Sequence, residues 1–403
     1  MQKRFLFWEN PKDAILCIVL FLMLVGAVNI FSASFVAADA MFGNGYHYLL
    51  RYIFFGILGL FGLYLMGWKI NYHFWLKHKQ QVYALAFLLL LAVDVFGKAA
   101  KGAQRWLQLG PVSLQPSEFV KLAVIILGAG YLGHLMDKSR IPHLTKFKVN
   151  LAFVEAAVLA FMVLIQPDMG TAAIIIALMV VLYIVAGLPL KEVGTLFSLG
   201  FLVMVAAVIK APYRLNRVLI WWNPWSDPQG NGYQAVQSFV SIGSGGWLGN
   251  SFGMGTGKFF FLPEAHTDFA FAIFCQEWGF LGAIGLMVVF AILALAIYRI
   301  GAHTTDRSGY LLVTGVNFLV VGQAIANMAM VCGLLPVIGV PLSFISYGGT
   351  SLIATLGAVG LVVAVYNAEI KKAREEEMQK PAFLRKTSKY DRTRFNPRGW
   401  RRD

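Results

Sequence analysis

Residues 263–298 read PEAHTDFAFAIFCQEWGFLGAIGLMVVFAILALAIY. The first six hold two carboxylates (Glu264 and Asp268), an imidazole (His266) and a hydroxyl (Thr267). The apolar run that follows exceeds the roughly 20 residues that a membrane-spanning helix needs. A carboxylate at the edge of the hydrocarbon can meet a lipid headgroup, whereas one at the bilayer centre usually serves ion or proton transport. The stretch therefore predicts a membrane helix and favours an enzyme that acts on a lipid.

The composition of the whole chain is that of a membrane protein. Of its 403 residues, 58% are hydrophobic and only 13% are charged. Because backbone groups in lipid must bond within their own segment, the apolar runs predict an all-α fold. We expect a polytopic bundle of about ten transmembrane helices with a large extracytoplasmic loop. The predicted spans are 14–34, 48–67, 81–97, 118–135, 149–166, 170–187, 192–210, 267–298, 310–335 and 347–367.

The positive charge predicts the orientation of the bundle. The formal net charge is +14, and with a cytoplasmic N-terminus 25 of the 34 lysines and arginines fall on the cytoplasmic side. This asymmetry follows the positive-inside rule, so we expect a multi-pass protein of the cytoplasmic membrane with both termini in the cytoplasm. The charge is thereby explained without nucleic acid as a partner. The three cysteines are scattered and show no metal-ligand spacing.

One membrane domain and one tail are expected. Residues 1–367 form the ten-helix domain, and residues 368–403 form a basic cytoplasmic tail whose low apolar content predicts disorder. The large outer loop, about 211–266, interleaves basic residues with tryptophans, which is typical of a segment at the depth of the lipid headgroups. A second outer loop covers 98–117.

Asp268 is the candidate catalytic residue. A helix beginning near Thr267 places Asp268 in the first turn, where the helix dipole favours an anion. One interpretation is a helix cap, in which Thr267 or Asp268 bonds free N–H groups. The other is a general base acting on a sugar or lipid hydroxyl, which the neighbouring Glu264, His266 and basic outer loops favour.

A second polar constellation opens the span at 118–135. Glu118 and Lys121 are three residues apart, so they share a helix face. They form either a structural ion pair or, with Arg105, a site that meets a phosphate from the outer side. Gln323 and Asn327 share one face of another span and can bond neighbouring helices.

The polar turn before the last span contains Ser346 and Tyr347 between glycines. These side chains either serve a hydroxylated substrate or cap the helix. Asp168 marks a tight turn, which turn chemistry alone explains. The candidate substrate-binding residues are Arg105, Glu118, Lys121, Arg214, Lys258, Glu264, His266, Thr267, Ser346 and Tyr347.

Seven strings together resemble a known family, the SEDS proteins (shape, elongation, division and sporulation). The resemblance runs from about residue 12 to 368. It is closer to the division branch than to the elongation branch, although the residues after Gly333–Pro336 lean towards elongation. The strings are Gly102–Trp106, Gln115–Lys121, Asn223–Pro228, Gly232–Ser238, Leu262–Phe269, Gly333–Pro336 and Phe344–Thr350.

The resemblance implies a ten-helix glycosyltransferase that polymerises lipid II into peptidoglycan strands, in septal synthesis. It implies a class B penicillin-binding protein as partner, together with other divisome or elongasome membrane proteins. The family's essential aspartate matches Asp268, which would take the proton from the acceptor hydroxyl while undecaprenyl diphosphate leaves the growing strand. A divalent cation, Mg²⁺ or Mn²⁺, could assist at the diphosphates, but no dedicated metal site is visible.

Three alternatives stay open. The chain could serve elongation instead of division. It could be a lipid II flippase or another transporter, which would place essential charges near the midplane and often carries an inverted repeat. It could also be a scaffold for division enzymes, for which Asp268 would be dispensable.

Overall fold

The computed structural model describes residues 10–100, 103–110, 112–138, 143, 147–209, 212–255, 257–259 and 262–379. A helix covers each of the ten predicted spans, which confirms the helical membrane bundle. Within the described residues, seven helices are long and apolar enough to cross a membrane, and two more contain shorter apolar runs. The helices are α1 (Pro11–Phe42), α2 (His47–Tyr64), α3 (Tyr72–Lys77), α4 (Lys79–Phe96), α5 (Pro116–Asp137), α6 (Phe147–Ile165), α7 (Met169–Val185), α8 (Leu190–Ile209), α9 (Pro212–Trp222), α10 (Tyr233–Gly245), α11 (Ala270–His303), α12 (Arg307–Asn317), α13 (Gln323–Val331) and α14 (Gly349–Gln379).

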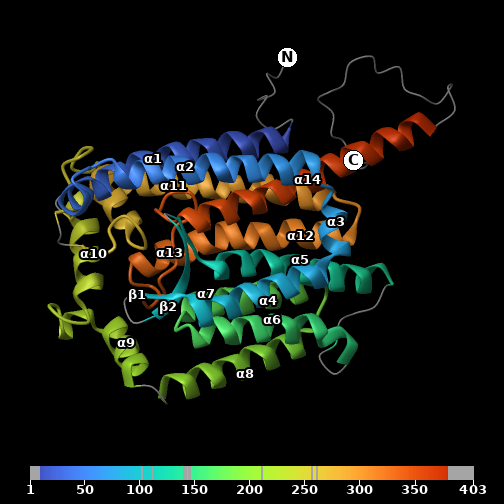
Figure 1. Cartoon of the computed structure of the whole chain (residues 1–403), viewed down its shortest axis with the longest axis horizontal. Coiled ribbons are helices and arrows are strands. Elements are labelled where there is room, and N and C mark those ends of the chain that lie inside the picture. The colour runs from blue at the N-terminus through green and yellow to red at the C-terminus, as the bar shows by residue number, and fades with distance from the viewer. Residues whose placement is uncertain are drawn as a thin grey trace, which may run out of the picture.

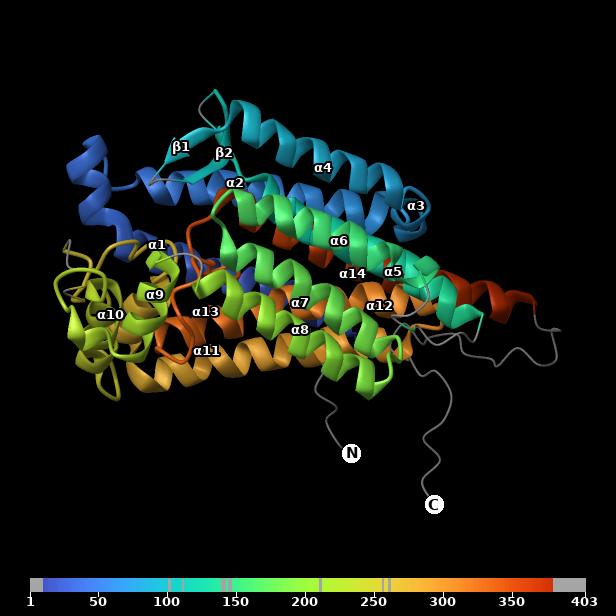
Figure 2. The same cartoon turned by 90° about the horizontal axis from the view of Figure 1, so that it is seen from below.

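The long helices run along the long axis of the molecule (Figure 1). Two π-helical turns continue them, Leu65–Lys69 after α2 and Phe318–Gly322 between α12 and α13. Helices α9 and α10 and the strands gather at one end, which we call the α10 end; α3 lies at the other, the α3 end (Figures 1 and 2). The connections at the two ends thus differ in length, and the longest ones lie at the α10 end.

Helix α14 is enclosed by its neighbours. In its apolar window 89% of the residues are buried, and the consecutive residues Leu361, Val362 and Val363 are all inaccessible to solvent. Since consecutive residues point to different sides of a helix, α14 is covered all round, as expected for a helix that is apolar on every face. It packs along α2 and also contacts α12 and α5.

The connection between α13 and α14, residues 332–348, packs back against the bundle. The Ser343 hydroxyl donates to the Val320 carbonyl at 2.9 Å. Two helices meet the backbone of this connection through glycines: Gly26 of α1 faces the Phe344 carbonyl, and Gly170 of α7 faces the Ile338 carbonyl. A side chain at either glycine would collide with that carbonyl, so only glycine permits the close approach.

The two loops that the sequence predicts on the outer side both contain regular structure. Residues 98–117 contain an antiparallel sheet of β1 (Lys98–Ala100), β2 (Ala103–Leu109) and β3 (Val112–Leu114), so the fold is not purely helical. Gln104 ties this sheet to α4 by donating to the Val93 and Gly97 carbonyls at 3.0 and 2.7 Å.

The large loop, 211–266, also contains regular structure: α9, a 3₁₀ turn at Pro224–Ser226 and α10. Figure 2 shows α9 and α10 together at the α10 end.

Two predicted boundaries were wrong. Helix α14 continues to Gln379, so residues 368–379 are helical and not part of a disordered tail; residues 380–403 lie outside the described residues. The extension is anchored by Glu369, whose carboxylate accepts from the Thr305 and Asp306 N–H groups at 3.1 and 3.4 Å. Helix α11 begins at Ala270, three residues after Thr267.

Replacing Gly170 tests this packing. We expect Gly170→Ala to cost about 1–3 kcal/mol of stability, because the methyl group must displace the Ile338 carbonyl. Thermal unfolding of the purified protein in detergent would measure the loss. Gly285→Ala is the matched control, since a side chain at Gly285 of α11 meets nothing within 4 Å. Equal melting temperatures for both variants would contradict the close approach.

Candidate active site

Residues 263–268, the acidic loop, form a tight turn that leads into α11. The N–H groups of Thr267 and Phe269 donate to the Glu264 carbonyl at 3.1 and 3.2 Å. The Thr267 hydroxyl donates to the Glu264 carboxylate at 2.9 Å. Glu264 itself has a φ of +56°, in the left-handed region that side chains seldom occupy. Backbone strain of this kind persists only where the surroundings hold it, and it is concentrated at functional sites.

Asp268 is held in place through its backbone. Asn327 of α13, which is inaccessible to solvent, donates from Nδ2 to the carbonyls of Asp268 and Val340, both at 2.7 Å. The Asp268 carboxylate faces the same connection, since a side chain at Gly339 would begin 3.5 Å from its Oδ2. Asp268 is half-buried and precedes the helix cap, which is Phe269. The carboxylate is therefore placed by α13 and the 332–348 connection.

An aromatic cluster stands beside the acidic loop. The Tyr347 N–H donates to the His266 carbonyl at 2.8 Å. The His266 ring lies 4.3 Å from the Tyr48 ring, centre to centre, and the Tyr48 ring lies 5.0 Å from that of Tyr347. Arg51 of α2 forms a side-chain hydrogen bond with Tyr347. The cluster thus brings a permanent cation to the acidic loop from a distant helix.

The phenol of Tyr347 keeps its proton in this setting. Burial raises its pKa above the ordinary value, and the Arg51 guanidinium beside it opposes part of that rise. A phenol with a raised pKa stays neutral at physiological pH, so it can donate a hydrogen bond to an anionic or hydroxylated ligand.

Glu118 and Lys121 form a buried ion pair, as one of the two interpretations predicted. Lys121 Nζ lies 2.9 Å from both carboxylate oxygens of Glu118, and both residues are at most 3% exposed. The same ammonium donates to Gln323 Oε1 at 2.8 Å, and Gln323 Nε2 donates to the Pro341 carbonyl at 3.0 Å. Through Gln323 the pair therefore braces the 332–348 connection.

Arg105 is engaged by the turn between α6 and α7. Its Nε donates to the Gln166 carbonyl at 3.1 Å, and Nη1 lies 3.9 Å from Asp168 Oδ2. Asp168 is the N-cap of α7 and accepts from the Thr171 N–H at 3.1 Å. In this arrangement Arg105 anchors strand β2 to the bundle.

Lys258 is also paired within the protein. Its ammonium is buried, donates to the Gly253 carbonyl at 2.6 Å and lies 3.4 Å from Glu277 Oε1. Ser32 of α1 bonds both partners of this pair. The network joins the glycine-rich stretch before the acidic loop to α1 and α11.

The structure gathers some of the candidate residues and separates others. Glu264, His266, Thr267, Asp268 and Tyr347 lie together. The Ser346 hydroxyl is buried and accepts from the Leu342 N–H at 2.9 Å, a bond within the turn. The side chain of Arg214, in α9, lies outside the described residues.

Two residues of the site were missed by sequence reasoning. The charge pattern predicts that Arg51 lies at the outer end of a helix, but no neighbouring motif in the sequence marks it as a site residue. Asn327 was noted only as a helix-bonding amide. Among the described residues, no group of three or more His, Cys, Asp or Glu side chains could hold a metal ion.

This fold and site define a class: a multi-pass helical membrane protein whose half-buried acidic site stands at one end of the bundle. The chain belongs to the cell cycle protein family of FtsW, RodA and SpoVE, whose model matches residues 13–371. The match confirms the resemblance to the SEDS proteins.

Curated relatives and solved structures agree with this assignment. The chain is 35% identical to "Probable peptidoglycan glycosyltransferase FtsW" of Thiomicrospira cyclica, covering 92% of this chain and 96% of that protein. It is 33% identical to "Stage V sporulation protein E" of Bacillus subtilis, covering 88% and 97%.

Among solved structures, the fold resembles a chain from "a peptidoglycan synthase complex", with a TM-score of 0.74 and 27% identity over 88% of this chain and 97% of that one. It also resembles RodA of Thermus thermophilus, with a TM-score of 0.66 and 26% identity over 88% and 96%.

The buried ion pair can be tested by a double substitution. We expect Lys121→Met alone to cost about 3–5 kcal/mol, because it leaves the Glu118 carboxylate buried without a counter-ion. Glu118→Leu with Lys121→Met should recover most of that loss, since no isolated charge is left. Unfolding of the purified proteins in detergent measures both. A double variant no more stable than Lys121→Met would argue against the pair.

Proposed function

We propose that this chain is a peptidoglycan glycosyltransferase that polymerises lipid II into glycan strands on the outer face of the cytoplasmic membrane, in the division branch of its family. One observation carries the proposal: Asp268 is half-buried, its backbone carbonyl is held by the buried Asn327 amide, and Arg51 joins the aromatic cluster beside the acidic loop through Tyr347. The names of the curated relatives support the same activity.

The proposed reaction is a glycosyl transfer. Asp268 accepts the proton of the acceptor sugar's 4-hydroxyl as that oxygen bonds the anomeric carbon of the growing strand. The bond from this carbon to the diphosphate breaks, and undecaprenyl diphosphate leaves with the electron pair. A carboxylate held by backbone bonds needs little reorganisation to act as general base, which favours the transfer.

Among the cations that the structure describes, Arg51 lies in the best position to bind the leaving diphosphate. Its guanidinium can offer paired N–H donors to phosphate oxygens, and it already stands beside the neutral Tyr347 phenol. The ammonium groups of Lys121 and Lys258 have carboxylate partners in buried sites, so they support the fold instead. Arg214 keeps its proposed role on sequence grounds alone.

We also propose that a divalent cation, Mg²⁺ or Mn²⁺, assists at the diphosphate of the substrate. The described residues offer no cluster of three or more metal-ligating side chains, so a cation would be held mainly by the diphosphate oxygens of the substrate.

We orient the protein with the α10 end outside the cell and the α3 end in the cytoplasm. The positive-inside rule supports this orientation, because it puts both termini and most basic residues on the cytoplasmic side. The acidic loop then meets lipid II on the outer face of the membrane, and the division role implies a septal location.

A class B penicillin-binding protein is the proposed partner, because the related solved chain comes from a complex that couples polymerization to crosslinking. Other divisome proteins would complete the assembly. The alternative function is a role in cell elongation, which the likeness to RodA of Thermus thermophilus favours.

The first experiment measures glycan polymerisation from labelled lipid II, with the candidate penicillin-binding partner present. We expect Asp268→Asn to lower the rate at least about 100-fold, because the amide cannot accept the proton. Asp39→Asn is the matched control, since Asp39 is an exposed carboxylate near the end of α1. Melting temperatures would show that both variants are folded. Full activity of a folded Asp268→Asn protein would exclude the general base.

A second experiment tests the cation. We expect Arg51→Gln to lower polymerisation about 10- to 100-fold, the effect of losing one charge-assisted hydrogen bond of about 1.5–3 kcal/mol. Arg51→Lys should retain part of the activity because it keeps the charge. Arg307→Gln, at an exposed position of the α3 end, serves as the control. A rate unaffected by Arg51→Gln would remove Arg51 from the site.

A further inference from the structure

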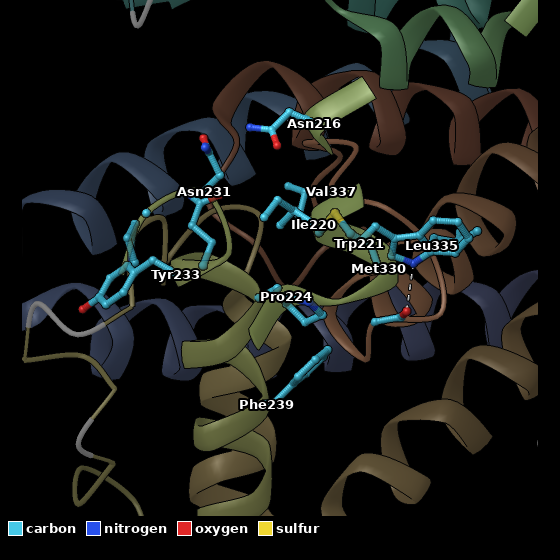
Figure 3. Close-up of a pocket in the computed structure, with 15 residues that line it drawn as sticks. Asn216, Ile220, Trp221, Pro224, Asn231, Tyr233, Phe239, Met330, Leu335 and Val337 are labelled. Carbon is cyan, nitrogen blue, oxygen red and sulfur yellow. Dashed lines mark hydrogen bonds between the residues drawn. The ribbon is translucent and has the colours of Figure 1, made fainter. Parts of the chain in front are cut away.

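A cavity lies at the α10 end, next to the acidic loop, and Asp268 is not among its lining residues. It has a volume of about 530 Å³, within the range of small-molecule pockets. Its walls come from α9, the turn before α10, α10 itself, the end of α13 and the start of the 332–348 connection (Figure 3). The lining residues include Asn216, Trp221, Asn231, Gln234, Met330 and Val337.

The cavity is held open by its own contacts. Trp221 Nε1 donates to the Gly333 carbonyl at 3.0 Å, which fastens α9 to the 332–348 connection (Figure 3). On the other side the Ser238 hydroxyl of α10 donates to the Val331 carbonyl at 2.8 Å. Both outer helices are therefore bonded to the same end of α13, so the cavity is a preformed feature of the fold.

The described lining is mostly aliphatic and aromatic, with a few polar side chains among them. It contains three amide side chains, those of Asn216, Asn231 and Gln234, and no Asp, Glu, Lys or Arg among the residues that the structure describes there. Figure 3 shows the amides of Asn216 and Asn231 at one side of the cavity and the indole of Trp221 at the other. Amides both donate and accept hydrogen bonds, while the indole and the aliphatic side chains offer apolar surface.

The described lining favours the binding of an uncharged ligand. A diphosphate would need arginine or lysine donors, and a charged peptide would lose its hydration without a counter-ion. A saccharide fits both kinds of surface, because its hydroxyls and acetamido groups match amides and its C–H faces and methyl groups match aromatic and aliphatic walls. The chemistry thus points to a chain of N-acetylated sugars.

Two segments connect the cavity to the candidate active site. Pro263 lines the cavity and directly precedes Glu264, the start of the tight turn that ends at Asp268. Val337 also lines it and stands two residues before Gly339, which faces the Asp268 carboxylate. A polymer seated in the cavity would therefore follow the same two segments towards Asp268.

We propose that this cavity, between α9, α10 and residues 333–337, is a binding subsite for the N-acetylated glycan chain on which the Asp268 site acts. The inference rests on the proposed function for the identity of the chain, but the subsite binds sugar independently of catalysis. By holding the strand between additions, the subsite lengthens the product before release.

The test measures the binding of chitotetraose, a soluble β-1,4-linked tetramer of N-acetylglucosamine, to the purified full chain in nanodiscs. Ligand-observed NMR would give the affinity. Ala235→Phe, which fills the cavity from α10, should weaken binding at least about tenfold, a loss of about 1.4 kcal/mol. Asn231→Ala should also weaken it, without adding bulk. Cellotetraose, which lacks the acetamido groups, should bind less tightly than chitotetraose.

Matched controls separate the cavity from its surroundings. Trp222→Ala and Asn223→Ala alter exposed side chains next to Trp221 that do not line the cavity, so they should bind chitotetraose as the unaltered protein does. Melting temperatures would show that each variant is folded. Affinity unchanged in both Ala235→Phe and Asn231→Ala, or no binding to the unaltered protein, would overturn the subsite.

The outcome is independent of the polymerase assay. Chitotetraose binding that depends on the cavity, in a protein with no polymerase activity, would support the subsite and count against the proposed function. Polymerisation by a protein that does not bind chitotetraose would support the proposed function and count against the subsite. In an active protein, Ala235→Phe should shorten the glycan strands on a sizing gel, whereas strands of unchanged length would contradict the role in holding the polymer.

Discussion

The site depends on one buried amide. Asn327 donates to the carbonyls of Asp268 and Val340, two segments that are far apart in the sequence. One helical turn earlier, Gln323 holds the Pro341 carbonyl and is itself held by the Lys121 ammonium. A single face of α13 therefore fixes both the catalytic candidate and the backbone opposite its carboxylate. Because the amide is inaccessible to solvent, each of these bonds would be costly to lose.

The candidate charged residues whose side chains the structure describes differ in their environment. Lys121 and Lys258 are buried and each has a carboxylate partner, since an unpaired charge in a low-dielectric interior is expensive. The acidic loop and Arg51 lie at the end of the bundle, where they are only half-buried. The half-buried charges can thus meet a substrate, while the buried, paired charges stabilise contacts between segments of the fold.

The acidic loop and the 332–348 connection each contribute to two features, the site around Asp268 and the cavity. Together they position Asp268, and Pro263 of the loop and Val337 of the connection also form walls of the cavity beside α9 and α10. A polymerase must hold a product that is also its next substrate, so a binding surface that continues from the reacting group has a direct use. The close packing of Gly170 against Ile338 extends this shared scaffold to α7.

The sequence by itself determined the helices, because length and apolar content suffice to define a membrane span, and a local string made Asp268 the catalytic candidate. The pairing of Glu118 with Lys121 was one of its two interpretations of that helix, since residues three apart share a helix face. It did not reveal Gln323 as the third partner, Arg51 as the neighbour of Tyr347, or the start of α11 at Ala270. Those features depend on contacts between helices distant in the sequence, which only tertiary packing brings within hydrogen-bond range.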